Sequence, residues 1–416
     1  MKLLAAVLGT VLIATAAPAH SDAVPPTEQV STGKVKSGLE VLLQNPPPLL
    51  IGKHVGLITN PTGVDRLLRS SVDLLAARSD IHLVALFGPE HGVRGDALGS
   101  FADGTDPKTH LPVYSLCCRT HSPSPASLKG LDALIFDIQD TGARFYTYTS
   151  TLALSMQAAA SRGILFVVLD RPNPLGGVDV AGPVLDPRWK SFIGMYPIPI
   201  LHGMTVGELA RLFNREFGIN ANLMVIPMDG WKRSMWFDDT GLPWVITSPG
   251  IPHFQTAVLY PAMGPLGDTN LSVGVQTTKP FEFVGATYAE PWQLRSKLEA
   301  RRLNGVAFRE AYWRGAPWLE TGGPQFAGVE IRVTDRAAYH PVDLTLQILD
   351  VVRHLYPNRF QWGPQAGGGY LFDLDMGTDK VRHELSLGKS PQQIEHEWQA
   401  DLDHFMKIRA SYLLYP

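Results

Sequence analysis

The sequence contains little cysteine: Cys117 and Cys118 are the only two among 416 residues, and they are adjacent. Adjacent cysteines cannot join distant segments; they can only close a strained eight-membered ring or pair between chains. Because a compact exported protein of this length does not need disulfides, we expect two unpaired thiols. The pair also lacks the spacing of zinc ligands, so it predicts no metal site.

A strong net charge is also absent, since the formal net charge is −3 at pH 7. This charge is too weak to attract nucleic acid or an anionic membrane surface, and neither is expected as a partner.

Long apolar runs are confined to the start of the chain. Residues 1–19 begin with Lys2, continue as an apolar stretch and end in Ala17-Pro18-Ala19, a pattern typical of a cleaved signal peptide. A membrane anchor is the less favoured alternative, because crossing a bilayer takes about 20 apolar residues. We therefore expect a secreted protein, with a periplasm as its compartment and no membrane span after signal cleavage.

Several catalytic signatures are missing from the sequence. It has no Gly-x-Ser-x-Gly elbow, no Gly-x-Gly-x-x-Gly after the first strand, no Walker lysine loop and no His-Glu-x-x-His. These absences disfavour lipase-type serine hydrolases and dinucleotide-dependent enzymes, and we expect no cofactor. His91, Asp137, Asp140 and Asp170 could approach one another, but their spacing matches no recognised metal motif. A metal-dependent hydrolase remains an alternative hypothesis, and no metal site is predicted.

Short apolar runs alternate with helical segments in the first part of the chain. Apolar runs bounded by turn residues are typical of strands that helices cover on both faces. Such alternation predicts an α/β fold with a Rossmann-like, doubly wound, mainly parallel sheet. The expected strands span residues 54–58, 83–87, 134–136, 164–169 and 223–226, and the expected helices include residues 67–78 and 151–162.

The chain is too long for one compact core, which usually stops growing at about 250–300 residues. We predict a disordered lead-in at 20–36, a Rossmann-like catalytic domain at 37–256 and a smaller C-terminal α+β domain at 257–416. The smaller domain should contain helices at 291–302, 344–355 and 394–405 and a strand at 329–333.

Two local patterns predict the start of one helix and the position of one long loop. Thr205 and Glu208 have the spacing of a capping box at the start of a helix. The stretch from Pro243 to Pro280 is rich in Pro, Gly and Thr and has little period, so it predicts a long ordered loop that forms an active-site wall.

Polar residues follow four of the expected strands: Asn60, Glu90, Asp137 with Asp140, and Asp170. Ligands of doubly wound sheets bind beyond the carboxyl ends of the strands, so these residues should converge on one edge.

Glu90 is the leading catalytic candidate because it follows a purely apolar strand, whose low-dielectric end disfavours a charged carboxyl and suits a general acid. The structural alternative is a glutamate that caps the turn or pairs with Arg94. Asp137 and Asp140 are the candidates for the second catalytic carboxylate, with Asp137 preferred. They could equally form a salt-bridged turn with Arg144.

An ordered set of motifs carries a family resemblance. These motifs are Phe87-Gly-Pro-Glu-His-Gly92, the run from Phe136 to Tyr148, Leu169-Asp-Arg-Pro-Asn-Pro-Leu-Gly-Gly177, His202-Gly-Met-Thr-Val-Gly-Glu208, Gly241-Leu-Pro-Trp244 and Tyr412-Leu-Leu-Tyr415. Together they resemble the exo-β-N-acetylmuramidase family of glycoside hydrolases, from about residue 37 to the C-terminus. The resemblance implies a Rossmann-like domain followed by a smaller one. It also implies removal of terminal N-acetylmuramic acid from peptidoglycan fragments, which would be the partners of the protein.

The resemblance and the strand ends together give a set of expected substrate-binding residues. They are Asn60, His91, Arg144, Tyr146, Asp170, Arg171, Asn173, His202 and Asn270. One segment departs from the family pattern: Gly267 and Val273 replace glutamates, and Val275 replaces an arginine. Because these changes remove charged hydrogen bonds from an expected pocket wall, a related amino sugar or a binding protein without turnover stays open as an alternative.

Overall fold

The computed structural model describes residues 35–97, 99–315 and 323–416. The predicted signal peptide and residues 20–34 of the predicted lead-in lie outside these ranges. No helix within them is long and apolar enough to cross a membrane.

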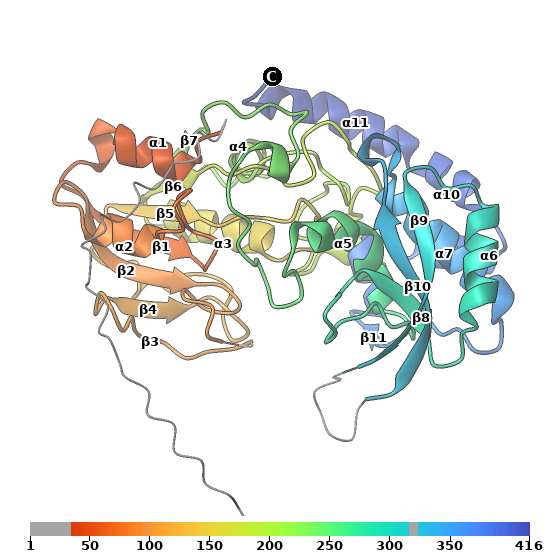
Figure 1. Cartoon of the computed structure of the whole chain (residues 1–416). Helices are drawn as coiled ribbons and strands as arrows, with labels where there is room; N and C mark the ends of the chain where they lie inside the picture. The colour runs from red at the N-terminus through yellow and green to blue at the C-terminus, as the bar shows by residue number, and fades with distance from the viewer. Residues whose placement is uncertain (1–34, 98, 316–322) are drawn as a thin grey trace, which may run out of the picture. The chain divides into compact units, whose positions relative to one another are not determined.

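A seven-stranded sheet organises the first part of the described chain (Figure 1). Its order is β3-β4-β2-β1-β5-β6-β7, and every neighbouring pair is parallel except β3 with β4. The strands are β1 (His54–Thr59), β2 (His82–Gly88), β3 (Gly104–Thr105), β4 (Pro112–Ser115), β5 (Ala133–Asp137), β6 (Leu165–Leu169) and β7 (Leu223–Ile226). The predicted mainly parallel sheet is confirmed.

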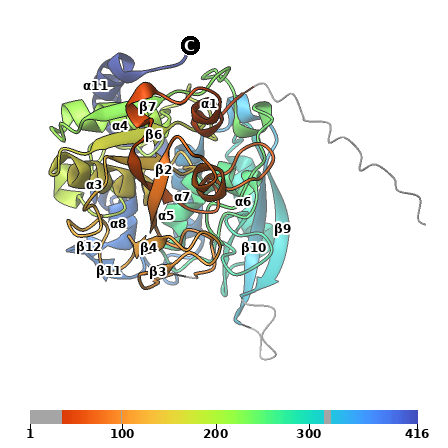
Figure 2. The same ribbon diagram turned by 90° about the vertical axis from the view of Figure 1, so that its left-hand side faces the viewer.

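Helices cover both faces of this sheet because successive strand residues point to opposite sides. In β1, Leu57 packs with the apolar residues of α1 (Gly38–Gln44) and α2 (Ser71–Ala76). Its neighbour Ile58 packs on the other face with α3 (Tyr148–Ala160) and α4 (Val206–Glu216). Figure 2 shows α1 on one side of the strands and α3 and α4 on the other.

The strand order reverses at β1, which places the active edge of the sheet. From β1 the chain adds β2 and β4 on one side, and then β5, β6 and β7 on the other. In such sheets the crevice at the reversal, beyond the carboxyl ends of the strands, is the usual ligand site.

The predicted capping box at the start of α4 is confirmed. The Glu208 backbone N–H donates to Thr205 Oγ1 at 3.3 Å, and the Thr205 N–H donates to Glu208 Oε2 at 3.0 Å. The two bonds satisfy backbone donors that the first turn of a helix leaves open.

The second part of the chain contains a three-stranded antiparallel sheet of order β8-β10-β9 with helices against it, which confirms the predicted α+β pattern. Its strands are β8 (Phe283–Ala286), β9 (Val306–Arg314) and β10 (Gln325–Val333), and β11 (Gln365–Ala366) pairs with β12 (Gly369–Tyr370). Its helices are α6 (Pro291–Ala300), α7 (Pro341–Leu355), α8 (Leu371–Met376), α9 (Lys380–Ser386), α10 (Pro391–Glu397) and α11 (Gln399–Arg409). Short 3-10 helices are η1 (Pro48–Leu50), η2 (Pro187–Trp189), η3 (Phe237–Asp239), η4 (Arg336–Ala338) and η5 (Ala410–Tyr412).

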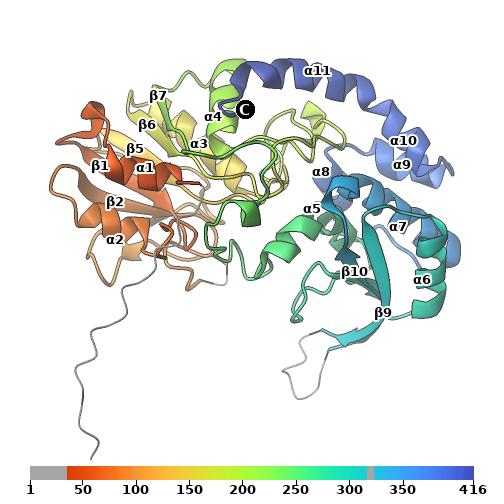
Figure 3. The same cartoon turned by 45° about the horizontal axis from the view of Figure 1, so that its top comes forward.

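The single helix predicted over 394–405 is two helices. Trp398, with ψ near 2°, ends α10 and precedes α11. Helix α11 then lies beside α4, where Phe405 packs on Leu209 and Phe213 (Figure 3).

The predicted loop from Pro243 to Pro280 was wrong over its middle, where the chain forms α5 (Phe254–Gly267). Pro261 and Pro265 lie inside this helix and are buried with its apolar residues. A helix that is apolar all round has no amphipathic period, because it is buried on every side. Packing of Leu259 and Met263 in the largest core cluster compensates for the backbone donors that the prolines lack.

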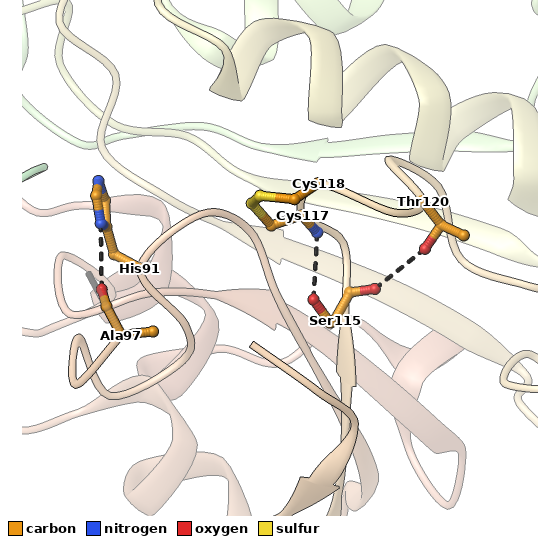
Figure 4. The surroundings of a disulfide bond; sticks show 6 residues. All are labelled: His91, Ala97, Ser115, Cys117, Cys118 and Thr120. Atoms are coloured by element: carbon orange, nitrogen blue, oxygen red, sulfur yellow. Dashed lines mark hydrogen bonds between the residues drawn. A yellow bond between two sulfur atoms is a disulfide. The ribbon is translucent and has the colours of Figure 1, made fainter. Parts of the chain in front are cut away.

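The expectation of unpaired thiols was also wrong. Cys117 and Cys118 form a disulfide in the turn just after β4 (Figure 4). Cys118 has a φ of 71°, and the Cys117 N–H donates to Ser115 Oγ at 3.3 Å. The turn therefore brings the two sulfur atoms together locally. The expectation failed because a protein that does not need a disulfide for stability can still form one between neighbouring residues.

Candidate active site

A cleft of about 1150 Å³ lies at the carboxyl ends of the strands. Elements from both parts of the chain line it: the turn after β2, the segment after β5, helix α5 with the run that follows it, and α8. Its volume lies just above the usual range for small-molecule sites, about 300–1,000 Å³, and leaves room for a saccharide of more than one unit. Of the strand-end residues predicted to converge here, Glu90 lines the cleft, whereas Asn60, Asp137, Asp140 and Asp170 do not.

Glu90 lies in the tight turn after β2 and is exposed to the cleft. The Gly92 N–H donates to the Pro89 carbonyl at 3.0 Å and closes this turn. The alternative pairing with Arg94 does not form, because Arg94 bonds instead to Asp73 and Asp106. The carboxyl of Glu90 is therefore available to a ligand.

His91 also lines the cleft. Its Nδ1 lies 3.3 Å from the Ala97 carbonyl oxygen, which orients the ring within the same turn (Figure 4).

Two tyrosines form part of the cleft wall near these residues. Tyr146 and Tyr260 meet edge to face, with ring centroids 5.7 Å apart. Burial raises the pKa of Tyr260 well above its usual value, and the charges of Asp375, Asp268 and Glu90 raise it further. The Tyr260 hydroxyl therefore keeps its proton and remains a hydrogen-bond donor in the cleft.

Asp268 and Asp375 form a carboxyl pair in the wall that α5 and α8 contribute. The two side chains are hydrogen-bonded to each other. Burial raises the pKa of Asp375 well above its ordinary value, and the charge of Asp268 raises it further. Burial also raises the pKa of Asp268, while the hydrogen bond from Asp375 lowers it. Asp375 is therefore the protonated member, and Asp268 is the acceptor.

Sequence reasoning missed this pair as a unit. Asp375 lies in a short helix rather than after a strand, so no strand-end pattern marks it. Asp268 belongs to the segment that departs from the family pattern, and its proximity to Asp375 depends on the packing of α5 against α8.

Asp137 is placed away from the cleft lining. It is fully buried and accepts two hydrogen bonds from Arg171, at 2.6 Å from Nε and 3.1 Å from Nη2. Arg171 also donates to the Val64 carbonyl at 3.0 Å. The pair ties the loops after β1, β5 and β6 together.

Asp140 and His202 are a second buried pair, with 3.9 Å between Oδ2 and Nε2. The Gly142 N–H donates to Asp140 at 2.7 Å. Burial raises the pKa of Asp140 to about 7 and lowers the pKa of His202 to about 3. His202 is therefore neutral near neutral pH, whereas Asp140 is about half protonated near pH 7.

Asp170 is buried behind the sheet edge as well. It accepts hydrogen bonds from Thr205 Oγ1 at 2.7 Å, from the Gly207 N–H at 2.8 Å and from the Tyr415 hydroxyl. Burial raises the pKa of Asp170 to about 6. These bonds anchor the start of α4 and the C-terminal residues to β6.

Three further predicted binding residues form internal hydrogen bonds. Arg144 is fully buried and donates to the carbonyls of Pro183, Ile198 and Asp375 at 2.7–2.8 Å. The other two, Asn60 and Asn173, bond to Thr62, Leu175 and Met204. Arg144 thereby holds the backbone of α8, and with it Asp375, in place.

Asn270 does line the cleft, but its side-chain amide is engaged. It accepts from the Tyr288 hydroxyl and the Gln361 N–H at 3.0 Å each and donates to the Arg359 carbonyl at 2.8 Å. Of the predicted site residues, the structure therefore brings Glu90, His91, Tyr146 and Asn270 to the cleft surface.

The departing segment lies in the cleft wall as expected, since Gly267, Val273 and Val275 all line it. The wall is therefore apolar where the family pattern has charged side chains. Within the described ranges, no group of three His, Cys, Asp or Glu side chains is placed to hold a metal ion.

A doubly wound sheet with an open cleft, and carboxyl groups on two of the cleft walls, has the groups that the class of glycoside hydrolases uses. The model of the N-terminal part of exo-β-N-acetylmuramidase NamZ matches residues 55–255, and the model of its C-terminal part matches residues 258–415. The chain belongs to this exo-β-N-acetylmuramidase family, which confirms the resemblance and the prediction of an enzyme.

Individual relatives agree with this assignment. The peptidoglycan β-N-acetylmuramidase NamZ of Bacillus subtilis (strain 168) is 44% identical over 409 residues, which cover 98% of this chain and 96% of that protein. Two crystal structures of DUF1343 family proteins from Bacteroides fragilis have TM-scores of 0.84 and 0.69, with 38% and 31% identity. Each alignment covers 92% of this chain and 99% of the other.

Proposed function

We propose that the enzyme removes terminal β-linked N-acetylmuramic acid from peptidoglycan fragments, with Glu90 as the general acid. The observation that carries this proposal is the position of Glu90: it is the exposed carboxyl at the end of β2, inside the cleft of a chain of this family.

The chemistry follows from the requirements of glycosidic bond cleavage. The leaving oxygen needs a proton as the bond to the anomeric carbon breaks, and a carboxylic acid within hydrogen-bond reach can supply it. Tyr146 and Tyr260 give the cleft aromatic surfaces, which pack on the C–H faces of a sugar ring.

A pair of chromogenic substrates tests the proposal. The wild-type enzyme should release nitrophenol from a β-N-acetylmuramide faster than from the matching β-N-acetylglucosaminide, because only the first carries the lactyl group. A faster reaction with the glucosaminide would contradict the preference for N-acetylmuramic acid and would indicate N-acetylglucosamine as the sugar that is removed. Turnover of neither would contradict it.

Glu90→Gln tests the assigned role. This variant should lose about 100- to 10,000-fold in kcat on a peptidoglycan-derived disaccharide, the usual contribution of a general acid. Its affinity for the disaccharide, measured by calorimetry, should stay close to that of the wild type. Asp229→Asn is the matched control, because it removes an exposed carboxylate paired with Lys36 outside the cleft lining.

We also propose that the chain is exported to a periplasm after cleavage behind Ala19. The support is the apolar N-terminal stretch and the small residues that end it. N-terminal sequencing of protein recovered from a periplasmic extract should begin at His20 or within a few residues of it. Recovery of the full-length chain from the cytoplasm alone would contradict this.

A further inference from the structure

The strand-end carboxyl groups that the sequence favoured for the second catalytic role do not line the cleft. Inverting and retaining glycosidases alike need a second carboxylate that acts near the anomeric carbon. Asp137 is fully buried in its bidentate pair with Arg171, and Asp140 is buried against the Gly142 N–H. Neither lines the cleft.

Asp268 has the position that the strand-end residues lack. It lines the same cleft as Glu90, but it follows α5, whereas Glu90 follows β2. It is also partly accessible, while its partner Asp375 is only 7% exposed. One carboxyl oxygen of Asp268 can thus face a ligand while the side chain stays bonded to Asp375.

Asp375 is rigidly held, so it can fix the side chain of Asp268. Its backbone carbonyl accepts from Arg144 Nη2 at 2.7 Å. Helix α8 ends at Gly377 in the left-handed region, with a φ of 69°, and a Cβ there would lie 2.7 Å from Arg144. Arg144 therefore holds the backbone of α8, and with it Asp375, in place at the cleft.

Tyr260 lines the same cleft as the two carboxyl groups. The charges of Asp268 and Glu90 both raise the pKa of its hydroxyl. No other carboxyl among the described residues that line the cleft is both accessible and paired with a buried acid.

We propose that Asp268 is the general base of the hydrolysis and that Asp375 is its positioning residue; this inference rests on the proposed function. A water molecule gives one proton to Asp268 while its oxygen bonds to the anomeric carbon. The bond from that carbon to the leaving oxygen breaks, and Glu90 gives its proton to the leaving oxygen. The β-linked sugar is released as the α-anomer, and proton exchange with solvent restores both carboxyls.

The raised pKa of Asp268 suits this role, since a base is most effective when its pKa approaches the working pH. Asp375, being protonated, donates the hydrogen bond that leaves Asp268 ionised.

Leaving-group chemistry separates the two carboxyls experimentally. On a nitrophenyl β-N-acetylmuramide, whose leaving group needs little protonation, Glu90→Ala should keep most of the wild-type kcat. Asp268→Ala should lose about 100-fold or more on the same substrate, in line with the contribution of a general base. Added azide, which needs no deprotonation, should restore turnover by Asp268→Ala and yield the glycosyl azide.

Asp375 is tested by a conservative and a non-conservative variant. Asp375→Asn keeps a donor for Asp268 and should retain the acidic limb of the kcat/KM pH profile near its wild-type position. Asp375→Leu removes the donor and should move that limb to higher pH. If Asp375→Leu does not fold, Asp375→Asn alone tests the role of Asp375. A large shift of the acidic limb of its kcat/KM pH profile would contradict positioning by hydrogen bonding.

Each outcome has a distinct meaning. Absence of wild-type turnover would overturn the proposed function and this inference together. If the wild type turns over the substrate, three results would overturn the inference alone. They are full activity of Asp268→Ala, no rescue of Asp268→Ala by azide, and the β-anomer as the first product of the wild type by proton NMR. Asp229→Asn serves again as the exposed-carboxylate control.

Discussion

At the scale of single residues, the acidic side chains near the sheet edge fall into two groups that differ in solvent access. Glu90 and Asp268 reach the cleft, whereas Asp137, Asp140 and Asp170 are buried under it. The buried carboxyls each have fixed donors, and a buried charge is stable only when it is paired and hydrogen-bonded. The buried group therefore shapes the loops, and the exposed group is left to meet the substrate.

The buried Asp137–Arg171 pair makes the first prediction at this scale. Arg171→Ala should lower the free energy of unfolding by about 3–5 kcal/mol, because it leaves Asp137 as an uncompensated buried charge. Urea unfolding followed by tryptophan fluorescence measures the change. Arg188→Ala is the control: it breaks an exposed pair with Asp186 and should cost less than about 1 kcal/mol. Equal losses in both variants would contradict the argument.

Asp140 makes a second prediction, through pH. Burial raises its pKa in the folded state to about 7, whereas an unfolded aspartate titrates near pH 4. Between these values the folded state holds more protons than the unfolded state, so raising the pH lowers the free energy of unfolding, by up to about 1.4 kcal/mol per pH unit. The contribution of Asp140 to the free energy of unfolding is thus complete below about pH 4 and is lost as the pH rises through about 7.

The Asp140→Asn variant isolates this effect. Asparagine does not titrate. The free energy of unfolding of the wild type minus that of the variant should therefore fall as the pH rises from about 4 to 7, and it should be constant above about pH 7. His202, whose pKa is lowered by burial, is present in both proteins and cancels from the difference. Urea unfolding at several pH values gives the comparison, and a difference independent of pH would refute the prediction.

At the scale of elements, the sequence predicted best where a helix or strand carries its own periodic or capping signal. β1, β2, β5, β6 and β7 have apolar runs with turn residues after them, and α4 has its capping box. Helix α5 gave no such signal, because it is apolar all round and contains two prolines. Its existence depends on tertiary packing, and so does the placement of Asp268 at its end.

The two capping boxes of α4 and α10 offer a matched prediction at this scale. Ser390→Ala should cost about 1 kcal/mol, because it removes one exposed cap at the start of α10. Thr205→Ala should cost clearly more, since the hydroxyl of Thr205 also donates to the buried Asp170. Chemical unfolding of both variants checks the order, and a larger loss for Ser390→Ala would contradict it.

At the scale of the whole molecule, the sequence predicted the fold class of both parts of the chain. It predicted the side of the cleft that the strand ends form, but not the carboxyl pair on the side that α5 and α8 form. The strand-end motifs predicted Glu90 and His91, and both line the cleft, because parallel strands end at one edge of the sheet. Asp375 comes from a helix more than 280 residues beyond Glu90, and local sequence patterns do not encode such a contact. The boundary predicted at residue 256 remains a prediction, although the described residues, from 35 onward, group as one compact unit.

The C-terminal residues join the last part of the chain to the seven-stranded sheet, and this yields the final prediction. The Tyr415 hydroxyl donates to Asp170 and accepts from the Met228 N–H at 2.9 Å. The Leu414 N–H donates to Glu208 at 2.7 Å. Deleting residues 414–416 should lower the free energy of unfolding by about 3 kcal/mol or more, because two buried carboxylates each lose a donor.

Calorimetry decides whether this connection makes the molecule cooperative. The wild type should unfold in one transition, and the deletion variant should unfold in one transition at a lower temperature, since apolar residues such as Phe145 and Leu201 remain packed in the same core cluster as α5 and α7. Leu387→Ala, at a side chain that is 79% exposed, is the control and should leave the transition unchanged. Two separate transitions in the wild type, or an unshifted one in the deletion variant, would show that the C-terminal residues do not couple the two sheets.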